Sequence, residues 1–210
     1  MNKVIILSVR PEWLAKIMNG EKTIEIRKDF PKNIELPATV LLYCTKEKPY
    51  LAYDSVDYDD SWGFPTSSQG YFLYKNKYDL ENNRDEETPA LNGLIPCKFT
   101  MKKTEKLDYK YFENNSTTAD AYAQAEIFVA DFDEPKIEKE SCLGATELWN
   151  YLGKKGGYAW HIDDLVIFDK PMELREFYGI LNDPKCIAVP TDPLKRAPQS
   201  WQYAYLESGK

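Results

Sequence analysis

Short apolar runs separated by polar turns predict a chain built largely of β-strands. Residues 4–7 and 40–44 are continuous apolar runs of the kind that form buried strands. Residues 94–101 and 200–206 also have strand character, and Pro96 within the first of these predicts an edge strand or a bulge. In residues 158–162, apolar and polar positions alternate, and residues 166–168 are expected to continue that strand after a break at residues 163–164.

Three segments predict helices. In residues 11–19, four apolar side chains fall on one helical face, Pro11 suits a first helical position, and Gly20 follows the last periodic residue. Residues 117–129 contain four alanines and few helix breakers, and residues 146–152 precede Gly153. The charged residues 131–140 and the proline-rich residues 184–198 are expected to be irregular.

Residues 49–92 follow no regular pattern but are dense in aromatic side chains. Their tyrosines, tryptophan and phenylalanines lie among aspartates, including Asp54, Asp57, Asp59 and Asp60, and such aromatic density is not typical of disorder. Two interpretations stay open: a partly ordered flap that packs against the rest of the domain, or a lid over a ligand site. The acidity of the segment counts against a role in binding a phosphate backbone.

The most informative stretch is residues 20–27, where three charged side chains come directly after a helix end. Ile24 and Ile26 are expected on one strand face, and Glu25 and Arg27 on the other, with about 7 Å between their Cα atoms. Lys22 has the opposite parity but directly follows a turn, so its convergence with Glu25 stays open. The set is either an ion-paired brace near the interior or part of a ligand pocket.

Composition and charge narrow the class of protein. The 210 residues, 43 % hydrophobic and 29 % charged, are sufficient for one core, and no apolar run is long enough for a membrane span or a signal peptide, so the expected location is the cytoplasm. A net charge of −7 argues against a broad phosphate-binding surface. Four dispersed cysteines and one histidine predict neither a metal site nor a cofactor.

The spacing Gly20-x-Lys22-x-x-Glu25-x-Arg27 resembles the GxKxxExR signature of ASCH domains, which belong to the PUA-like superfamily. The segment VIILSVRPEWLAKIMNGEKTIEIRKDFP is similar to that family's opening strand, helix and second strand, and GGYAWHIDDLVIFDKPMELREF resembles a late strand and the segment after it. PLKRAPQSWQYAYLE resembles the closing segment of uncharacterised ASCH proteins from bacteria and their phages. The resemblance implies one α+β domain over residues 1–210: a small, mostly antiparallel PUA-like β-barrel with flanking helices and an aromatic-rich insertion at about residues 49–92.

The resemblance also implies a function: binding of RNA, or of a single-stranded or modified nucleotide, in a cleft lined by the signature. Because every base offers a π-face, aromatic side chains near that cleft are candidates for base stacking, and short basic pairs are candidates for phosphate contacts. For each of these residues, core packing or a solvated loop is the plainer interpretation. The expected ligand-binding residues are Ser8, Arg10, Lys22, Glu25, Arg27, Tyr43, Trp160 and Trp201, and the expected phosphate contacts are Lys154, Lys155, Lys195 and Arg196.

Two alternatives from other classes remain. Some ASCH proteins hydrolyse the amide of N4-acetylcytidine with a threonine nucleophile two residues before the arginine, where this chain has Glu25. An amidohydrolase here would instead use Lys22 and Glu25 as its acid–base pair. The other alternative is a protein–protein interaction module that uses the tyrosine-rich insertion. His161 lacks a nucleophile at diagnostic spacing, so no triad is expected, and the sequence favours a binding protein over an enzyme.

Overall fold

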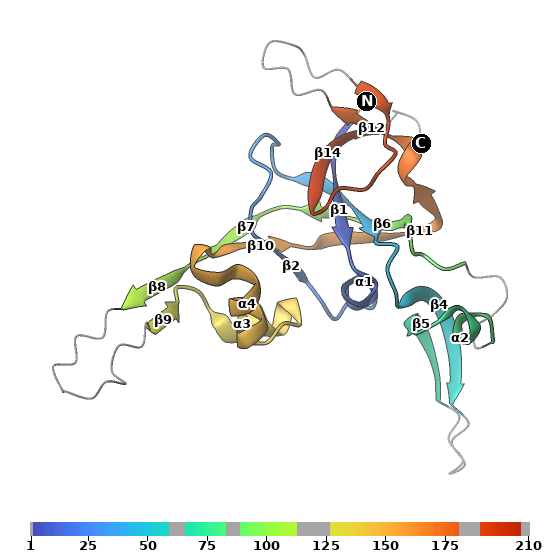
Figure 1. The fold of residues 1–210 in the computed structure, drawn as a ribbon, viewed down its shortest axis with the longest axis horizontal. Coiled ribbons are helices and arrows are strands. Elements are labelled where there is room, and N and C mark those ends of the chain that lie inside the picture. The colour runs from blue at the N-terminus through green and yellow to red at the C-terminus, as the bar shows by residue number, and fades with distance from the viewer. Residues whose placement is uncertain (1, 59–65, 83–88, 113–126, 181–189, 207–210) are drawn as a thin grey trace. The chain divides into compact units, whose positions relative to one another are not determined.

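The computed structural model describes residues 2–58, 66–82, 89–112, 127–180 and 190–206 (Figure 1). These residues form an α+β protein with four α-helices and mostly antiparallel strands. The chain divides into two compact units, which are described separately below. Unit 1 comprises residues 1–21, 37–100 and 163–210, and unit 2 comprises residues 22–36 and 101–162.

Unit 1 contains a seven-stranded sheet with the order β11-β6-β3-β1-β14-β12-β13. Strand β1 pairs with β3 in parallel and with β14 in antiparallel orientation, and β6–β11, β12–β14 and β12–β13 are antiparallel. The described strands of this sheet form an open order with β11 and β13 at its ends. The strands are β1 (Asn2–Val9), β3 (Ala38–Cys44), β6 (Leu94–Met101), β11 (Asp163–Glu173), β12 (Phe177–Ile180), β13 (Pro190–Pro193) and β14 (Trp201–Leu206).

The central strand β1 is buried on both faces, which explains its continuous apolar run. Val4 and Ile6 belong to a core cluster with Leu41, Tyr43, Ile95, Phe177 and Ala204, whereas Ile5 and Leu7 point to the opposite face and are fully buried there. The strands expected at residues 4–7, 40–44, 94–101 and 200–206 are therefore confirmed as β1, β3, β6 and β14.

Helix α1 (Pro11–Met18) confirms the helix predicted over residues 11–19. Pro11 occupies the start of the helix, and Leu14, Ile17 and Met18 bury its apolar face. Gly20 adopts φ 77°, its N–H donates to the Ile17 carbonyl at 3.0 Å, and the Glu21 N–H donates to the Lys16 carbonyl at 2.8 Å. These two bonds form a Schellman motif, which requires the left-handed conformation that glycine adopts at little cost.

The aromatic insertion is ordered where the structure describes it. A hairpin of β4 (Tyr50–Tyr58) and β5 (Thr66–Tyr74) precedes helix α2 (Lys77–Asn82), while residues 59–65 and 83–88 lie outside the described part (Figure 1). The Asn19 side chain, just after α1, accepts from the Tyr71 N–H at 2.9 Å and donates to the Tyr71 carbonyl at 3.0 Å. The hairpin is thus attached to α1 as a flap on unit 1. The sequence pattern predicted neither these strands nor this helix.

Pro96 lies in an interior strand, because β6 sits between β3 and β11. The predicted edge position was therefore wrong. The alternative of a bulge is confirmed: the register of β11 shifts between Ile167, opposite Cys97, and Met172, opposite Ile95. This irregularity faces Pro96, which has no N–H to contribute to a regular ladder.

Unit 2 contains an antiparallel three-stranded sheet with the order β2-β10-β7, and a separate β8–β9 hairpin. Its core cluster consists of Ile24, Ile26, Leu107, Ile137, Leu148, Leu152 and Ala159. Its elements are β2 (Ile24–Arg27), β7 (Thr104–Leu107), β8 (Tyr109–Phe112), β9 (Ile127–Ala130), α3 (Glu134–Ser141), α4 (Ala145–Leu152), the 3-10 turn η1 (Gly153–Lys155) and β10 (Gly157–His161).

Two predictions in unit 2 were wrong. Residues 127–129 of the predicted helix belong to strand β9, and residues 117–126 lie outside the described part. Residues 134–140, expected to be a loop, form most of α3. The Asp133 side chain caps this helix by accepting from the Lys136 N–H at 3.2 Å, and Ile137 is its one fully buried apolar side chain, so an apolar periodicity was missing.

The other expectations near the end of the chain were largely correct. The helix predicted over residues 146–152 is α4, and the strand predicted over residues 158–162 is β10. The predicted break at residues 163–164 coincides with a register shift in β11, where Asp164 has φ 47°. The expectation that residues 166–168 continue the same strand was wrong, because they belong to β11 of the seven-stranded sheet and β10 belongs to the three-stranded one. Within the proline-rich segment, β13 is a short strand where an irregular chain was expected, and residues 184–189 lie outside the described part. A second 3-10 turn, η2 (Leu174–Glu176), comes after β11.

Candidate functional site

The three charged residues of the signature converge in unit 2. Lys22 Nζ lies 3.4 Å from Glu25 Oε2, and Arg27 Nη2 lies 2.8 Å from Glu25 Oε1. The convergence of Lys22 with Glu25, left open by the sequence, is therefore found. Lys22 and Glu25 are only 3 % and 6 % exposed, so the set is a buried chain of ion pairs in which one carboxylate bridges two cations.

Lys22 also holds the carboxyl-terminal end of α3. Its Nζ donates to the Ser141 carbonyl at 2.8 Å, and the Thr23 N–H donates to the Glu140 carbonyl at 2.9 Å. The last carbonyls of a helix lack partners within the helix and carry its negative dipole end, so a cation there is favourable. Residues 22 and 23 therefore join β2 to α3.

Burial dominates the electrostatics of this charge set. Desolvation lowers the pKa of Lys22, while the neighbouring Glu25 carboxylate opposes that shift. Tyr151 of α4 also lies at the set: burial raises the pKa of its phenol, and the charge of Arg27 and a side-chain hydrogen bond to it act in the opposite direction. A lysine with a lowered pKa beside a carboxylate is chemically suited to proton transfer.

The aromatic candidates Trp160 and Trp201 lie in different units. Trp160 of β10 is opposite Glu25 in the strand register, is fully buried, and donates from Nε1 to the Asp29 carbonyl at 3.2 Å. Trp201 of β14 is half-buried, and its ring meets Tyr203 edge to face at 5.4 Å. The burial of Trp160 favours core packing over base stacking, whereas Trp201 keeps part of its ring exposed.

Ser8 and Arg10, expected beside the signature, belong to unit 1. The Ser8 hydroxyl donates to the Pro198 carbonyl at 2.7 Å and is buried. Arg10 is exposed and forms an ion pair with Glu47 at 3.1 Å. The predicted phosphate contacts Lys154 and Lys155 are exposed side chains of η1 in unit 2. The expected site residues are thus divided between the two units.

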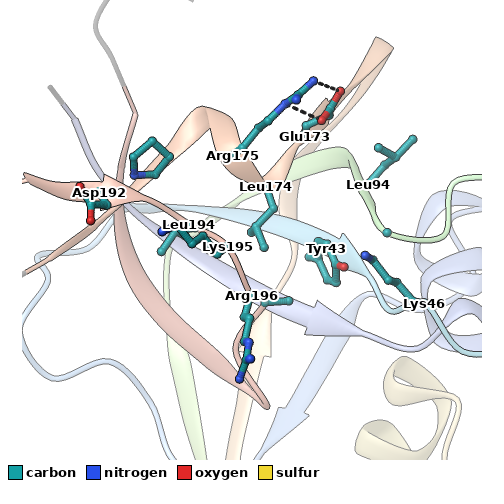
Figure 2. Close-up of a pocket in the computed structure, with 13 residues that line it drawn as sticks. Tyr43, Lys46, Leu94, Glu173, Leu174, Arg175, Asp192, Leu194, Lys195 and Arg196 are labelled. Carbon is teal, nitrogen blue, oxygen red and sulfur yellow. Dashed lines mark hydrogen bonds and ion pairs between the residues drawn. The ribbon is translucent and has the colours of Figure 1, made fainter.

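Three of the expected residues line one pocket of unit 1, shown in Figure 2: Tyr43, Lys195 and Arg196. The pocket has a volume of about 850 Å³. Its walls come from the end of β3, from η2 after β11, and from the segment between β13 and β14. We call it the basic pocket, because four cationic side chains and only two acidic ones line it: Lys46, Arg175, Lys195 and Arg196, with Glu173 and Asp192.

The four cations of the basic pocket differ in their partners. Arg175 is held by Glu173, with Nε–Oε2 at 2.7 Å and Nη2–Oε1 at 2.9 Å (Figure 2). Among the described residues, Lys46, Lys195 and Arg196 form no ion pair, and all three are exposed. The alkyl stem of Lys46 packs over Gly93, where a Cβ would come within 3.2 Å of it. No sequence motif marks Lys46 and Arg175, which are isolated single cations brought together by the fold.

The floor of the basic pocket is apolar and rests on the core of unit 1. Tyr43 belongs to the core cluster, and Leu174 and Leu194 pack against it. Tyr43 is 5 % exposed, and burial raises the pKa of its phenol, so the hydroxyl remains a neutral hydrogen-bond donor at neutral pH. The pocket can therefore offer cations to an anionic group and an apolar surface to the group attached to it.

Other chemistries find less support in the described part of the chain. His161 Nε2 lies 3.5 Å from Glu105 Oε2. The described residues contain no group of three or more histidine, cysteine or acidic side chains positioned to hold a metal ion. Of the described helices, none has the length and apolar character needed to cross a bilayer.

No protein-family model matches the chain, and no curated protein matches it either.

Proposed function

We propose that this protein binds RNA, or a single-stranded or modified nucleotide, and that the basic pocket of unit 1 receives a phosphate of that ligand. The observation that supports this most is the gathering of Lys46, Arg175, Lys195 and Arg196 around one pocket in a chain whose net charge is −7. In an acidic protein, such a local excess of cations needs a reason, and an anionic ligand supplies one.

The state of the cations favours phosphate. Lys46, Lys195 and Arg196 form no ion pair within the described part of the chain, so a ligand meets them without first displacing a protein carboxylate. An arginine fork and two flexible ammonium groups together match the tetrahedral oxygens of a phosphate. The exposed position of all three is typical of groups that contact a nucleic-acid backbone.

The apolar floor favours a nucleotide over a bare anion. A volume of about 850 Å³ is far larger than a phosphate and lies within the usual range of ligand pockets. Leu174 and Leu194 offer apolar contact to a sugar or base, and the neutral Tyr43 hydroxyl offers a donor to a carbonyl or phosphate oxygen.

The ASCH resemblance and a PUA-like barrel are part of this proposal. The binding roles of Lys22, Glu25 and Arg27 stay a prediction, and a ligand there has to exchange its own contacts for the ion pairs that Glu25 already makes. The lowered pKa of Lys22 keeps the amidohydrolase alternative open to test, with Lys22 and Glu25 as the acid–base pair.

The test uses the full chain and a fluorescein-labelled, eight-nucleotide single-stranded RNA of mixed sequence, followed by anisotropy. We expect saturable binding, weakened about tenfold or more in Lys195→Ala/Arg196→Ala. The matched control is Lys75→Ala/Lys77→Ala, which removes two exposed lysines of the same unit that lie outside the pocket. The proposal is overturned if both double variants lose RNA affinity equally, or if the wild type does not bind the RNA. Release of acetate from N4-acetylcytidine makes the protein an enzyme instead.

A further inference from the structure

A second pocket of unit 1 lies between the aromatic hairpin and β11. Its volume is about 390 Å³, and its lining includes Tyr53, Tyr71, Pro89, Phe168, Asp169 and Pro171. We call it the tyrosine–proline pocket. It shares no lining residue with the basic pocket, and the nucleotide-binding proposal does not use it.

The aromatic side chains of this pocket have a fixed arrangement. Tyr53 and Tyr71 are opposite each other in the β4–β5 register, and their rings meet edge to face with centroids 5.3 Å apart. The backbone of Tyr71 is bound on both sides by the Asn19 side chain. Burial raises the pKa of Tyr71, so its ring carries no charge at neutral pH. Neutral tyrosine faces attract cations through the ring quadrupole.

The charge of the tyrosine–proline pocket is negative. Asp169 is the one formally charged side chain among the described residues that line it. This carboxylate is exposed and has no ion-pair partner within the described part of the chain. Two tyrosine rings beside one open carboxylate suit an ammonium group, because charge and cation–π attraction act on it together.

The surroundings indicate that the cation arrives on a protein. Tyr53 and Ile167 of the lining are 39 % and 38 % exposed, and Leu73, on the same face of β5 as Tyr71, is 41 % exposed. These apolar groups extend beyond the pocket, so a small free amine bound inside it leaves them exposed to solvent. Exposed apolar surface around a pocket is typical of a protein-binding site.

We propose that the tyrosine–proline pocket binds a lysine side chain of a partner protein, with apolar residues on either side of that lysine. The ammonium group pairs with Asp169 and contacts the faces of the Tyr53 and Tyr71 rings. The flanking apolar residues cover Leu73 and Ile167. This surface gives the insertion a role independent of nucleotide binding.

The test is a titration of the isotope-labelled full chain, followed by amide NMR shifts, with the blocked tripeptide acetyl-Leu-Lys-Leu-amide. We expect shifts confined to the β4–β5 hairpin and β11. The same peptide with norleucine in place of lysine is expected to bind about three- to tenfold more weakly, as is the lysine peptide to Asp169→Asn. Glu81→Gln, which removes an exposed carboxylate of α2 outside the pocket, is the matched control and leaves the affinity unchanged.

Several results overturn the inference. Equal affinity for the lysine and norleucine peptides shows that the charge of the ligand does not contribute to binding. Unaltered binding to Asp169→Asn shows that the ammonium group does not pair with this carboxylate. Shifts that n-butylammonium chloride reproduces at the same concentration indicate a free amine instead of a protein ligand. An absence of shifts at 20-fold molar excess and millimolar peptide also contradicts the proposal. Because Asp169 is exposed, the Asn variant is expected to fold, and its unperturbed spectrum without peptide verifies this.

Discussion

Lys22 donates a 2.8 Å hydrogen bond from Nζ to the backbone carbonyl of Ser141, the last residue of α3. The same ammonium group lies 3.4 Å from Glu25, which in turn binds Arg27. The residues that carry the ASCH-like signature thus have a structural explanation of their own. Gly20 ends α1, Lys22 joins β2 to the end of α3, and Glu25 compensates two buried or half-buried cations.

Replacing Lys22 by Met tests this structural role. The change keeps side-chain length but removes the charge, and so leaves the Ser141 carbonyl and one side of the Glu25 carboxylate without their donor. We expect the free energy of unfolding to fall by about 2–4 kcal/mol, measured by urea denaturation. The control is Lys155→Met, which replaces an exposed lysine of the same unit and is expected to change the free energy of unfolding by about 0.5 kcal/mol or less. Equal effects of the two variants contradict the account.

Gly20→Ala tests whether the signature glycine is a helix end. A Cβ at this position meets no atom within 4 Å, so any loss of stability comes from the backbone at φ 77°. We expect Gly20→Ala to lower the free energy of unfolding by about 1 kcal/mol. Gly20→Asn is expected to lower it by about half as much, because Asn tolerates the left-handed conformation better. Thermal unfolding of the two variants against the wild type measures both. A Gly20→Ala variant as stable as the wild type shows that the Schellman motif is dispensable.

Cys44 gives the protein a predicted weakness at alkaline pH. Burial, reinforced by the charges of Glu12 and Glu47, raises the pKa of its thiol from an ordinary 9.0 to about 12. Between these values the unfolded chain loses the proton and the folded chain keeps it, so stability falls as pH rises. The stability difference between wild type and Cys44→Ala is therefore nearly constant up to about pH 8 and shrinks above it, by at most about 1.4 kcal/mol per pH unit. Urea denaturation from pH 7.5 to 10.5 measures the difference, and a constant value contradicts this ionisation.

The sequence predicted those elements whose signals are local. Helix α1 has an initial proline, one apolar face and a terminating glycine, and β1 and β3 have uninterrupted apolar runs. Helix α3 was missed because Ile137 is its one fully buried apolar residue, although Asp133 and Pro135 at its start were available as a cap signal. The β4–β5 hairpin was missed because aspartates interrupt its alternation. One of them, Asp54, is buried and accepts a hydrogen bond from Tyr74.

The candidate site depended on contacts that are distant in sequence. The alternation of the strand predicted that Glu25 and Arg27 lie on the same face. The position of Lys22, however, depends on its contact with the end of α3, more than a hundred residues later in the chain. The basic pocket itself was not predicted: Tyr43, Lys195 and Arg196, which line it, were expected at a cleft formed by the signature residues. Lys46 and Arg175 join it because β3, η2 and the segment before β14 meet in unit 1. Because these cations are single residues in separate segments, no local sequence pattern predicts that they line one pocket.

The salt dependence of RNA binding tests the central claim most directly. Anisotropy titrations with the eight-nucleotide RNA between 50 and 300 mM NaCl give the slope of the logarithm of affinity against the logarithm of salt concentration. If Lys195 and Arg196 contact phosphates, the magnitude of this slope falls by about 1.4 in the double alanine variant, since each contact with a single strand contributes about 0.7. The Lys75→Ala/Lys77→Ala control keeps the wild-type slope. An unchanged slope in Lys195→Ala/Arg196→Ala contradicts phosphate binding in the basic pocket.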